Sequence, residues 1–215
     1  MAESIKGLKR TDYCGKFDIS NVGQTITVFG WVQRQRDLGN LIFIDLRDRS
    51  GIIQLSFNDQ TDREIFAKAQ SVRSEYVVAA VGTVAERESK NHDIPTGEIE
   101  VIVNDFRIVS KAQTPPFEIE KSEKVGDEIT LKYRYLNLRN EKLTKNILMR
   151  HKIAKIAREY FYDNDFIEIE TPMMIKSTPE GARDYVVPSR VHNGKFYALP
   201  QSPQIYKQLT MIAGF

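Results

Sequence analysis

Apolar and polar residues alternate over short runs in the first half of the chain, which is the pattern of β-strands with one buried face. These runs predict strands at Ile26–Val32, Leu41–Arg47, Ile52–Phe57, Tyr76–Arg87 and Glu98–Val109. Between the third and the fourth, apolar residues recur at helical spacing over residues 62–73. Five strands with a helix after the third is the order of the OB-fold, a small barrel whose second and third strands bind oligonucleotides.

The second half of the chain has one long helix signal followed by short apolar runs. Residues 146–164 place apolar side chains on one helical face and most charges on the other, which predicts an amphipathic helix. Residues 166–171 alternate and stop at a proline, so we expect a strand there. Val186–Val187 and Phe196–Leu199 predict two further strands, joined by a hairpin turn at residues 192–195.

Prolines and mixed charges separate the two halves. Residues 114–116 are Thr-Pro-Pro, and the residues that follow, up to 128, fit neither a strand nor a helix pattern. Because proline denies the backbone a hydrogen-bond donor, we expect a linker or hinge here. The predicted organisation is a barrel domain at residues 1–112, a hinge at 113–140 and a second domain at 141–215.

Composition and charge exclude few classes of partner or function. The formal net charge of +2 neither requires nor excludes a nucleic-acid partner. Cys14 is the only cysteine, which rules out an intrachain disulfide and fits a reducing compartment, and the three histidines are not at metal-ligand spacing. No apolar run approaches the length of a membrane span, and the start of the chain lacks the apolar core of a signal peptide. We therefore expect a cytoplasmic protein with no metal site and no membrane partner.

The predicted second and third strands carry residue types that bind single-stranded nucleic acid. An aromatic such as Phe43 stacks on a base for roughly 1–3 kcal/mol, and an amide such as Gln54 hydrogen-bonds the edge of a base. Arg34 and Arg36, in the polar turn before the second strand, would hold phosphates. The alternative interpretation is structural: Phe43 belongs to the core, and the arginines form an ordinary solvated rim that consists of Arg34, Arg36, Arg47 and Arg49.

A second candidate site lies in the last part of the sequence. Ser202 is a favoured N-cap and Pro203 suits the first helical position, so we expect a helix to begin here. Gln204 and Lys207, three residues apart, would share one face of that helix. With an acidic residue in the loop at 178–183, they suit a small ligand that carries both an amine and a carboxylate. No Ser-His-Asp order, phosphate-binding glycine loop or paired catalytic carboxylate is evident. These patterns alone predict a nucleic-acid-binding barrel joined to a domain with a small polar pocket.

Five segments occur in an order that is typical of one family. They are GWVQRQRDLGNLIFIDLRDRSGIIQ from residue 30, KYRYLNLR from 132, FIEIETPMM from 166, TPEGARDYVVPSR from 178 and FYALPQSPQIYKQL from 196. In this order they resemble the anticodon-binding barrel, the hinge, motif 1 and two aspartate-site segments of the bacterial-type aspartyl-tRNA synthetases, which are class II enzymes. The resemblance implies an N-terminal all-β OB-fold barrel, followed by the first part of an α+β class II catalytic domain built on an antiparallel sheet with helices.

The resemblance also implies roles on the barrel. Phe43 would stack on the central base of the anticodon, and Gln54 would read beside it. Arg36 and Glu100 would lie near the flanking anticodon positions. Leu38 would lie in the turn that reads the last anticodon base, where leucine favours an enzyme restricted to one tRNA. The implied anticodon-binding set is Arg34, Arg36, Leu38, Phe43, Gln54 and Glu100.

An aspartate pocket is implied in the same way. Glu180 would lie on a mobile loop that closes over the amino acid and contacts its amino group. Ser202, Gln204 and Lys207 would line the pocket. Lys207 would face the side-chain carboxylate, because an ammonium pairs well with aspartate and poorly with the amide of asparagine. Motif 1, which ends at Pro172, would form a two-fold homodimer interface.

The reaction implied for the full enzyme is activation of L-aspartate by ATP, assisted by Mg²⁺, to aspartyl-adenylate, and then transfer to tRNA(Asp). Residues 1–215 lack the family's motif 2, a Phe-Arg-x-Glu segment that holds ATP, and its glycine-rich motif 3, and they include no catalytic residue. We therefore expect this chain alone to bind the anticodon without catalysis and to bind ATP and Mg²⁺ poorly. Two alternatives stay open, namely a stand-alone module that binds tRNA or single-stranded nucleic acid, and a lysine- or asparagine-specific relative.

Overall fold

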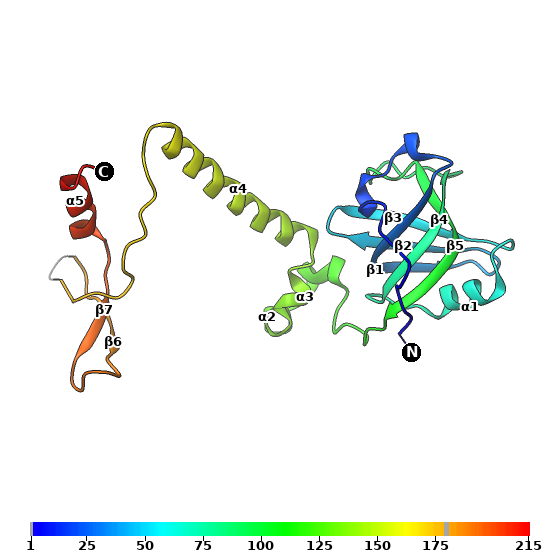
Figure 1. Ribbon diagram of the computed structural model, residues 1–215. Helices are drawn as coiled ribbons and strands as arrows, with labels where there is room; N and C mark the ends of the chain where they lie inside the picture. The colour runs from blue at the N-terminus through cyan, green and yellow to red at the C-terminus, as the bar shows by residue number, and fades with distance from the viewer. Residues whose placement is uncertain (1, 179–180) are drawn as a thin grey trace. The chain divides into compact units, whose positions relative to one another are not determined.

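The computed structural model describes residues 2–178 and 181–215, and the chain divides into two compact units, Met1–Ile129 and Thr130–Phe215. The first unit contains a closed barrel of five strands (Figure 1). The strands are β1 (Thr25–Asp37), β2 (Ile42–Asp48), β3 (Gly51–Phe57), β4 (Val77–Glu86) and β5 (Ile99–Ser110). Neighbouring strands are antiparallel except β3 and β5, which are parallel. The expected OB-fold and its strands are confirmed.

The interior of the barrel follows from the alternation along each strand. In β2, Ile42 and Ile44 are fully buried, whereas Phe43 between them faces outward. The same alternation in the other strands fills the interior with branched and aromatic side chains. The rings of Phe57 and Phe106 meet edge to face there, with centroids 5.1 Å apart. This apolar interior is the main favourable contribution to folding of the unit.

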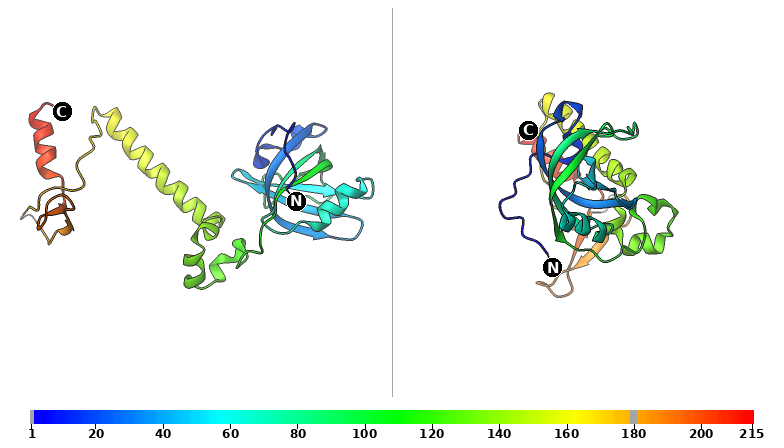
Figure 2. Two further views of the ribbon diagram at one scale, coloured as in Figure 1. Left: turned by 60° about the horizontal axis from the view of Figure 1, so that its bottom comes forward. Right: turned by 90° about the vertical axis from the view of Figure 1, so that its right-hand side faces the viewer.

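The helix α1 (Arg63–Ser71) follows β3 and packs against the barrel (Figure 2). Asp62 caps its N-terminus by accepting hydrogen bonds from the backbone N–H groups of Glu64 at 2.8 Å and Ile65 at 3.3 Å. Ala69 is buried, and Ile65 packs against the core from the same helix. The helix predicted between the third and fourth strands is therefore confirmed.

The end of β1 differs from the sequence-based expectation. The polar composition of residues 33–40 predicts a turn, but β1 continues through the first five of them. A β-bulge between Val32 and Arg34 shifts the register, after which Arg36 pairs with Phe43 of β2. The turn prediction is wrong here because a bulge interrupts the alternation without ending the strand. Arg34 and Arg36 consequently lie on a strand.

Two 3-10 helices, η1 (Cys14–Lys16) and η2 (Ile19–Asn21), precede β1. Cys14 is fully buried, and its backbone N–H donates to Asp48 Oδ2 at 2.7 Å. Burial, and then the neighbouring Asp48 carboxylate, raise the pKa of the Cys14 thiol, so the thiol stays protonated. Burial on its own raises the pKa of Asp48, but the hydrogen bonds from Cys14 and Ser50 outweigh burial and lower that pKa. Cys14 is thus a core residue.

The segment expected as a hinge, residues 113–140, contains three short helices. They are η3 (Ile119–Lys124), α2 (Asp127–Lys132) and α3 (Arg134–Asn137). The boundary between the two compact units falls inside this segment, after Ile129. The sequence pattern does not reveal these helices because none spans more than two turns, too short for a hydrophobic period to show.

The second unit combines helices with a small hairpin. Its elements are α4 (Glu141–Asp163), β6 (Tyr185–Pro188), β7 (Phe196–Leu199) and α5 (Gln204–Ile212), with β6 and β7 antiparallel. The predicted long helix and the hairpin are confirmed. The helix α4 begins five residues earlier than the apolar pattern indicates. The reason is that Asn140 caps it by accepting a hydrogen bond from the N–H of Lys142 at 3.0 Å.

Residues 166–171 do not form a strand in the described part of the chain, so that prediction is wrong. Alternation alone does not make a strand, which needs a neighbouring strand for its backbone hydrogen bonds. Ile167 and Ile169 are exposed, as are apolar side chains of α4 such as Ile153 and Tyr160. Among the described helices, none combines the length and the hydropathy needed to cross a membrane.

Candidate nucleic-acid interface and amino-acid site

Phe43 lies on the outer face of β2. Its neighbours Ile42 and Ile44 are fully buried, but Phe43 is partly exposed and lies outside the hydrophobic core. The guanidinium carbon of Arg36 is 5.4 Å from the centroid of the Phe43 ring, within the range of a cation–π contact. The interpretation of Phe43 as a core residue is therefore wrong. The ring occupies an outer face on which a base can stack.

A row of polar side chains crosses the barrel beside Phe43. Arg36 Nη2 on β1 donates to Asp45 Oδ1 on β2 at 3.0 Å and to Gln54 Oε1 on β3 at 2.9 Å. Gln54 Nε2 donates in turn to Glu100 Oε2 on β5 at 2.7 Å. The register places Asp45 opposite Gln54 and Gln54 opposite Glu100. Three predicted residues, Arg36, Gln54 and Glu100, are thus joined in one network together with Asp45.

In this row Gln54 is buried, and Arg36 has N–H donors that its hydrogen bonds to Asp45 and Gln54 do not use. The Gln54 residue is only 3% exposed, so its amide is held in place. Arg36 Nε is buried and has no hydrogen-bond partner within the described residues. A guanidinium carries five donors, and the two bonds above use only Nη2. Arg36 therefore keeps donors for a phosphate or a base oxygen.

Leu38 and Arg34 lie at the edge of this face. Leu38 is 68% exposed in the turn between β1 and β2, where its N–H donates to the carbonyl of Leu41 at 2.9 Å. Gly39 has a φ of +87° in this turn, which favours glycine, and its N–H donates to Asp37 Oδ1 at 2.9 Å. Arg34 is exposed on β1. A defined turn thus presents the Leu38 side chain to solvent.

The arginines of this region do not form one uniform rim. Arg47 Nη2 lies 2.8 and 3.1 Å from the two carboxylate oxygens of Glu75, and the two side chains are only 16% and 4% exposed. The rim interpretation is therefore wrong for Arg47, which forms a largely buried ion pair. Arg49 remains exposed, with its guanidinium carbon 4.3 Å from the centroid of the Tyr13 ring. The sequence analysis missed both contacts because their partners lie far away in the chain.

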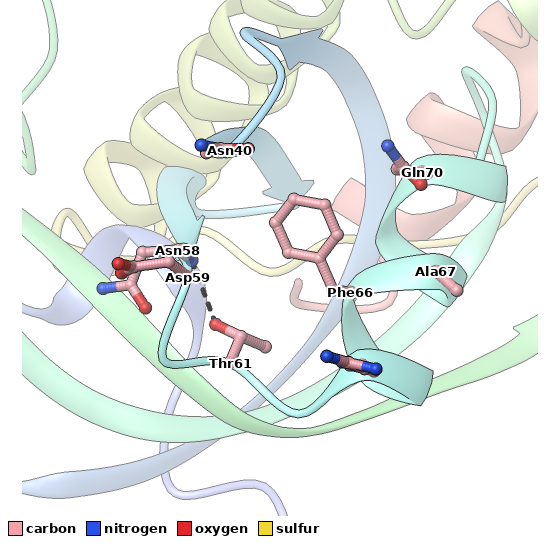
Figure 3. A pocket seen from close by; sticks show the side chains of 8 residues that line it. Asn40, Asn58, Asp59, Thr61, Phe66, Ala67 and Gln70 are labelled. Carbon is pink, nitrogen blue, oxygen red and sulfur yellow. Dashed lines mark hydrogen bonds between the residues drawn. The ribbon is translucent and has the colours of Figure 1, made fainter.

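A cavity of about 240 Å³ opens beside α1 (Figure 3). The Phe66 ring points into it, and the backbone N–H of Asn58 donates to Thr61 Oγ1 at its wall, at 3.0 Å. The lining residues are Asn40, Asn58, Asp59, Thr61, Arg63, Phe66, Ala67 and Gln70. The sequence analysis singled out none of them, and the anticodon-binding set predicted above does not line this cavity.

The predicted aspartate pocket is only partly described. Glu180 lies outside the described residues. Ser202, Gln204 and Lys207 are exposed, and the last two lie on α5. The N-cap position of α5 is Pro203, without a side-chain cap hydrogen bond, so the prediction of Ser202 as the N-cap is wrong. A cap needs its side-chain oxygen at the residue that flanks the first turn, and the helix begins one residue later than expected.

A second cavity, of about 380 Å³, lies in the loop before β6. Its described lining is Ser177, Thr178, Gly181, Ala182, Arg183, Asp184 and Val186. The N–H of Ala182 donates to Gln201 Oε1 at 3.3 Å, and Ser177 Oγ donates to Asp184 Oδ2 at 2.9 Å. Gly181 has a φ of +78°, which favours glycine, and a Cβ there would have to displace the Gln201 amide. Ser202, Gln204 and Lys207 do not line this cavity.

The remaining predictions concern a metal and a dimer interface. No cluster of three or more His, Cys, Asp or Glu side chains suited to a metal ion occurs within residues 2–178 and 181–215. Pro172 is exposed at the end of the extended segment that follows α4. Its role at an interface stays a prediction.

An OB-fold barrel with a polar row beside a partly exposed aromatic is an architecture that nucleic-acid-binding proteins share. Two family descriptions match these parts of the sequence. "OB-fold nucleic acid binding domain" matches residues 26–109, and "tRNA synthetases class II (D, K and N)" matches residues 126–215. Together the two descriptions match an OB-fold barrel followed by a segment similar to the class II tRNA synthetases.

Two curated proteins are similar to the whole of this chain. The aspartate--tRNA ligase of Ruminiclostridium cellulolyticum is 57% identical over 217 residues, covering 100% of this chain and 36% of the relative. The aspartate--tRNA(Asp/Asn) ligase of Caldanaerobacter subterraneus subsp. tengcongensis is also 57% identical, covering 100% of this chain and 37% of the relative. Over its whole length the chain is thus similar to aspartate--tRNA ligases. It spans little more than a third of the length of the curated relatives it matches.

Solved structures agree on the fold. An asparaginyl-tRNA synthetase from Pyrococcus horikoshii superposes with a TM-score of 0.79 at 24% identity, covering 95% of this chain and 45% of that one. A putative aspartyl-tRNA synthetase from Leishmania major superposes with a TM-score of 0.83 at 23% identity, covering 99% and 43%. At these identities the similarity establishes the architecture and not the substrate.

Proposed function

We propose that the barrel of this chain binds the anticodon loop of tRNA(Asp), as part of a longer protein that attaches L-aspartate to that tRNA. The 57% identity to aspartate--tRNA ligases over the whole chain supports the substrate class. The placement of Phe43 carries the proposal for the binding mode, because its ring is partly exposed beside Arg36, which also donates a hydrogen bond to Gln54. An aromatic ring next to a guanidinium and an amide is suited to stack one base and to hydrogen-bond its edge.

The proposed activity of the longer protein is the two-step ligation of aspartate. ATP, with Mg²⁺ neutralising its phosphates, would convert L-aspartate into aspartyl-adenylate, and the aspartyl group would then pass to the terminal ribose of the tRNA. We assign Glu180, Ser202, Gln204 and Lys207 to the aspartate pocket as part of this proposal. Residues 1–215 alone would bind the anticodon without catalysis, because they lack the Phe-Arg-x-Glu and glycine-rich segments that hold ATP. We place this function in the cytoplasm.

The range of tRNAs is a finer point of the proposal. Relatives at 57% identity are named both as aspartate--tRNA ligases and as aspartate--tRNA(Asp/Asn) ligases, so overall similarity does not separate the two. Leu38, exposed in the turn between β1 and β2, favours the restricted kind under the role assigned to that turn.

We also propose that the longer protein is a homodimer, with the segment that ends at Pro172 at the two-fold axis. Support comes from the apolar side chains left exposed there, since Ile167, Ile169, Met173 and Met174 are all exposed. Exposed apolar side chains that gather on one surface are costly in water unless a partner covers them.

Substitution of Phe43 by alanine tests the anticodon proposal. The variant should lose about 1–3 kcal/mol of binding free energy for an anticodon stem-loop RNA of tRNA(Asp), roughly a 5- to 150-fold rise in Kd, because a base loses its stacking partner. Fluorescence anisotropy with a labelled stem-loop measures this change directly.

Tyr13→Ala provides the matched control. Tyr13 is also a partly exposed aromatic in contact with a guanidinium, but it lies outside the predicted anticodon set. Its removal should change the Kd by less than about twofold. Equal RNA affinity of Phe43→Ala and the unmodified chain would refute the assignment of β2 as the binding face.

A further inference from the structure

The Gln54 amide has one free donor and one free acceptor. An amide oxygen accepts two hydrogen bonds and an amide nitrogen donates two. Arg36 occupies one acceptor position of Gln54 Oε1 at 2.9 Å, and Glu100 takes one N–H of Nε2 at 2.7 Å. The second acceptor position of Oε1 and the second N–H of Nε2 are therefore left for a ligand.

The two neighbours also determine which way the amide faces. A 180° turn of the Gln54 amide would set its N–H groups against the Arg36 guanidinium, which is a donor only. The same turn would set its oxygen against the Glu100 carboxylate, which is an acceptor only when ionised. Both contacts would be repulsive in a residue that is 3% exposed, where unpaired polar groups are costly. One orientation is therefore strongly preferred.

The Asp45 carboxylate fixes the position of the Arg36 guanidinium. Arg36 Nη2 donates to Asp45 Oδ1 at 3.0 Å as well as to Gln54, so the carboxylate anchors the guanidinium between two strands. The Arg36 side chain is 35% exposed and that of Asp45 is 26% exposed. Without this anchor, a long and partly exposed arginine side chain gains alternative rotamers in solvent and constrains the amide less.

We propose that Asp45 is a positioning residue that acts through Arg36 to fix the orientation of the Gln54 amide, and that this fixed orientation selects the base at the centre of the anticodon. Glu100 acts on the amide from the opposite side. The inference rests on the proposed anticodon function. Aspartate codons have adenine in the middle, so the central anticodon base is uracil.

The chemistry of the bases explains the selection. Uracil presents a donor at N3 and an acceptor at O4, whereas cytosine presents an acceptor at N3 and a donor at N4. The two Watson–Crick edges are therefore opposite in order. An amide that is free to turn can match either base, but an amide fixed in one orientation matches only one of them at a given stacked position.

Base discrimination by the 215-residue chain tests the inference. Two anticodon stem-loop RNAs that differ only in uracil or cytosine at the central position are titrated, and the ratio of their Kd values is the readout. The unmodified chain should prefer uracil. Asp45→Ala should reduce the ratio about five- to tenfold, because the amide can then turn to pair with cytosine. Asp45→Asn, which keeps an acceptor oxygen at the same position, should retain most of the ratio.

A matched acidic residue on the same barrel serves as control. Asp105 on β5 pairs with Arg107 at 2.8 Å with similar exposure, 40% and 28%, but is not part of the network. Asp105→Ala should leave the ratio unchanged. If Asp45→Ala does not fold, as judged by its circular dichroism, Asp45→Ser replaces it with the same expectation, since serine is too short to reach Arg36 in the same way.

The outcomes separate this inference from the function on which it rests. If the unmodified chain binds neither RNA, the proposed function fails and the inference fails with it. If it binds RNA but does not discriminate the two bases, or if Asp45→Ala weakens both RNAs equally and keeps the ratio, the anticodon proposal stands and the positioning role of Asp45 is overturned. A selective loss of the preference for uracil supports it.

Discussion

Removal of the Glu75 carboxylate should destabilise the barrel far more than removal of an exposed charge. Arg47 and Glu75 are 16% and 4% exposed and make two contacts, at 2.8 and 3.1 Å. Glu75→Met leaves the Arg47 guanidinium poorly solvated and without this partner. Loss of one member of a buried pair costs about 3–5 kcal/mol. Because Arg47 keeps some solvent exposure and a contact with Glu120 at 3.5 Å, we expect about 2–3 kcal/mol.

Urea unfolding measures this loss. Trp31 is the only tryptophan and pairs with Arg47 across β1 and β2, so its fluorescence reports on the barrel, with circular dichroism as a second probe. The reference variant is Lys90→Met, which removes exposed ion pairs with Glu86 and Glu98 and should leave the urea midpoint almost unchanged.

The double variant makes the test specific for the pair. Arg47→Met combined with Glu75→Met should cost clearly less than the sum of the two single variants, because the double variant leaves no unpaired buried charge. The reasoning is refuted if Glu75→Met costs no more than Lys90→Met, or if the two single losses simply add.

Two further predictions concern pH and catalysis. The folded-state pKa of Asp48 lies below the ordinary value of 3.8, because its hydrogen bonds outweigh burial. Its contribution to stability is thus present above that pH and lost as the pH falls through the lower folded-state value. The urea midpoint of Asp48→Asn should therefore fall less between pH 6 and pH 3 than that of the unmodified chain, and an identical fall would contradict this. Aspartate-dependent ATP–pyrophosphate exchange should be undetectable with the 215-residue chain and present in a longer protein that includes the ATP-holding segments; robust exchange by this chain would show that the ATP site is already complete.

Local alternation was sufficient to predict the barrel strands, and it also contained a signal for the outward direction of Phe43. Asp45 and Arg47 share the parity of Phe43 along β2, whereas Ile42 and Ile44 have the opposite parity. Polar residues at alternate positions indicate which face meets solvent, so Phe43 belongs to the outer set. Considering Phe43 alone, rather than with its alternate neighbours, leaves the core interpretation open.

Features that depend on distant partners were not predictable in this way. Arg47 and Arg49 are two residues apart, yet Arg47 forms a largely buried ion pair with the distant Glu75, whereas Arg49 is exposed. Residues 166–171 alternate like a strand, but no neighbouring strand pairs with them in the described structure. The local sequence therefore predicts neither the burial of Arg47 nor the missing strand, because both depend on partners far away in the chain.

The candidate recognition row shows how recognition depends on barrel closure. Arg36, Asp45, Gln54 and Glu100 come from four different strands, and the parallel pairing of β3 with β5 brings Gln54 opposite Glu100. A slip of one residue in that pairing would direct Glu100 into the apolar interior and Val101 outward, because side chains alternate between the two faces of a strand. The burial of Ile99 and Val101 opposes this slip. The same apolar residues that stabilise the barrel therefore maintain the register on which the orientation of the Gln54 amide depends.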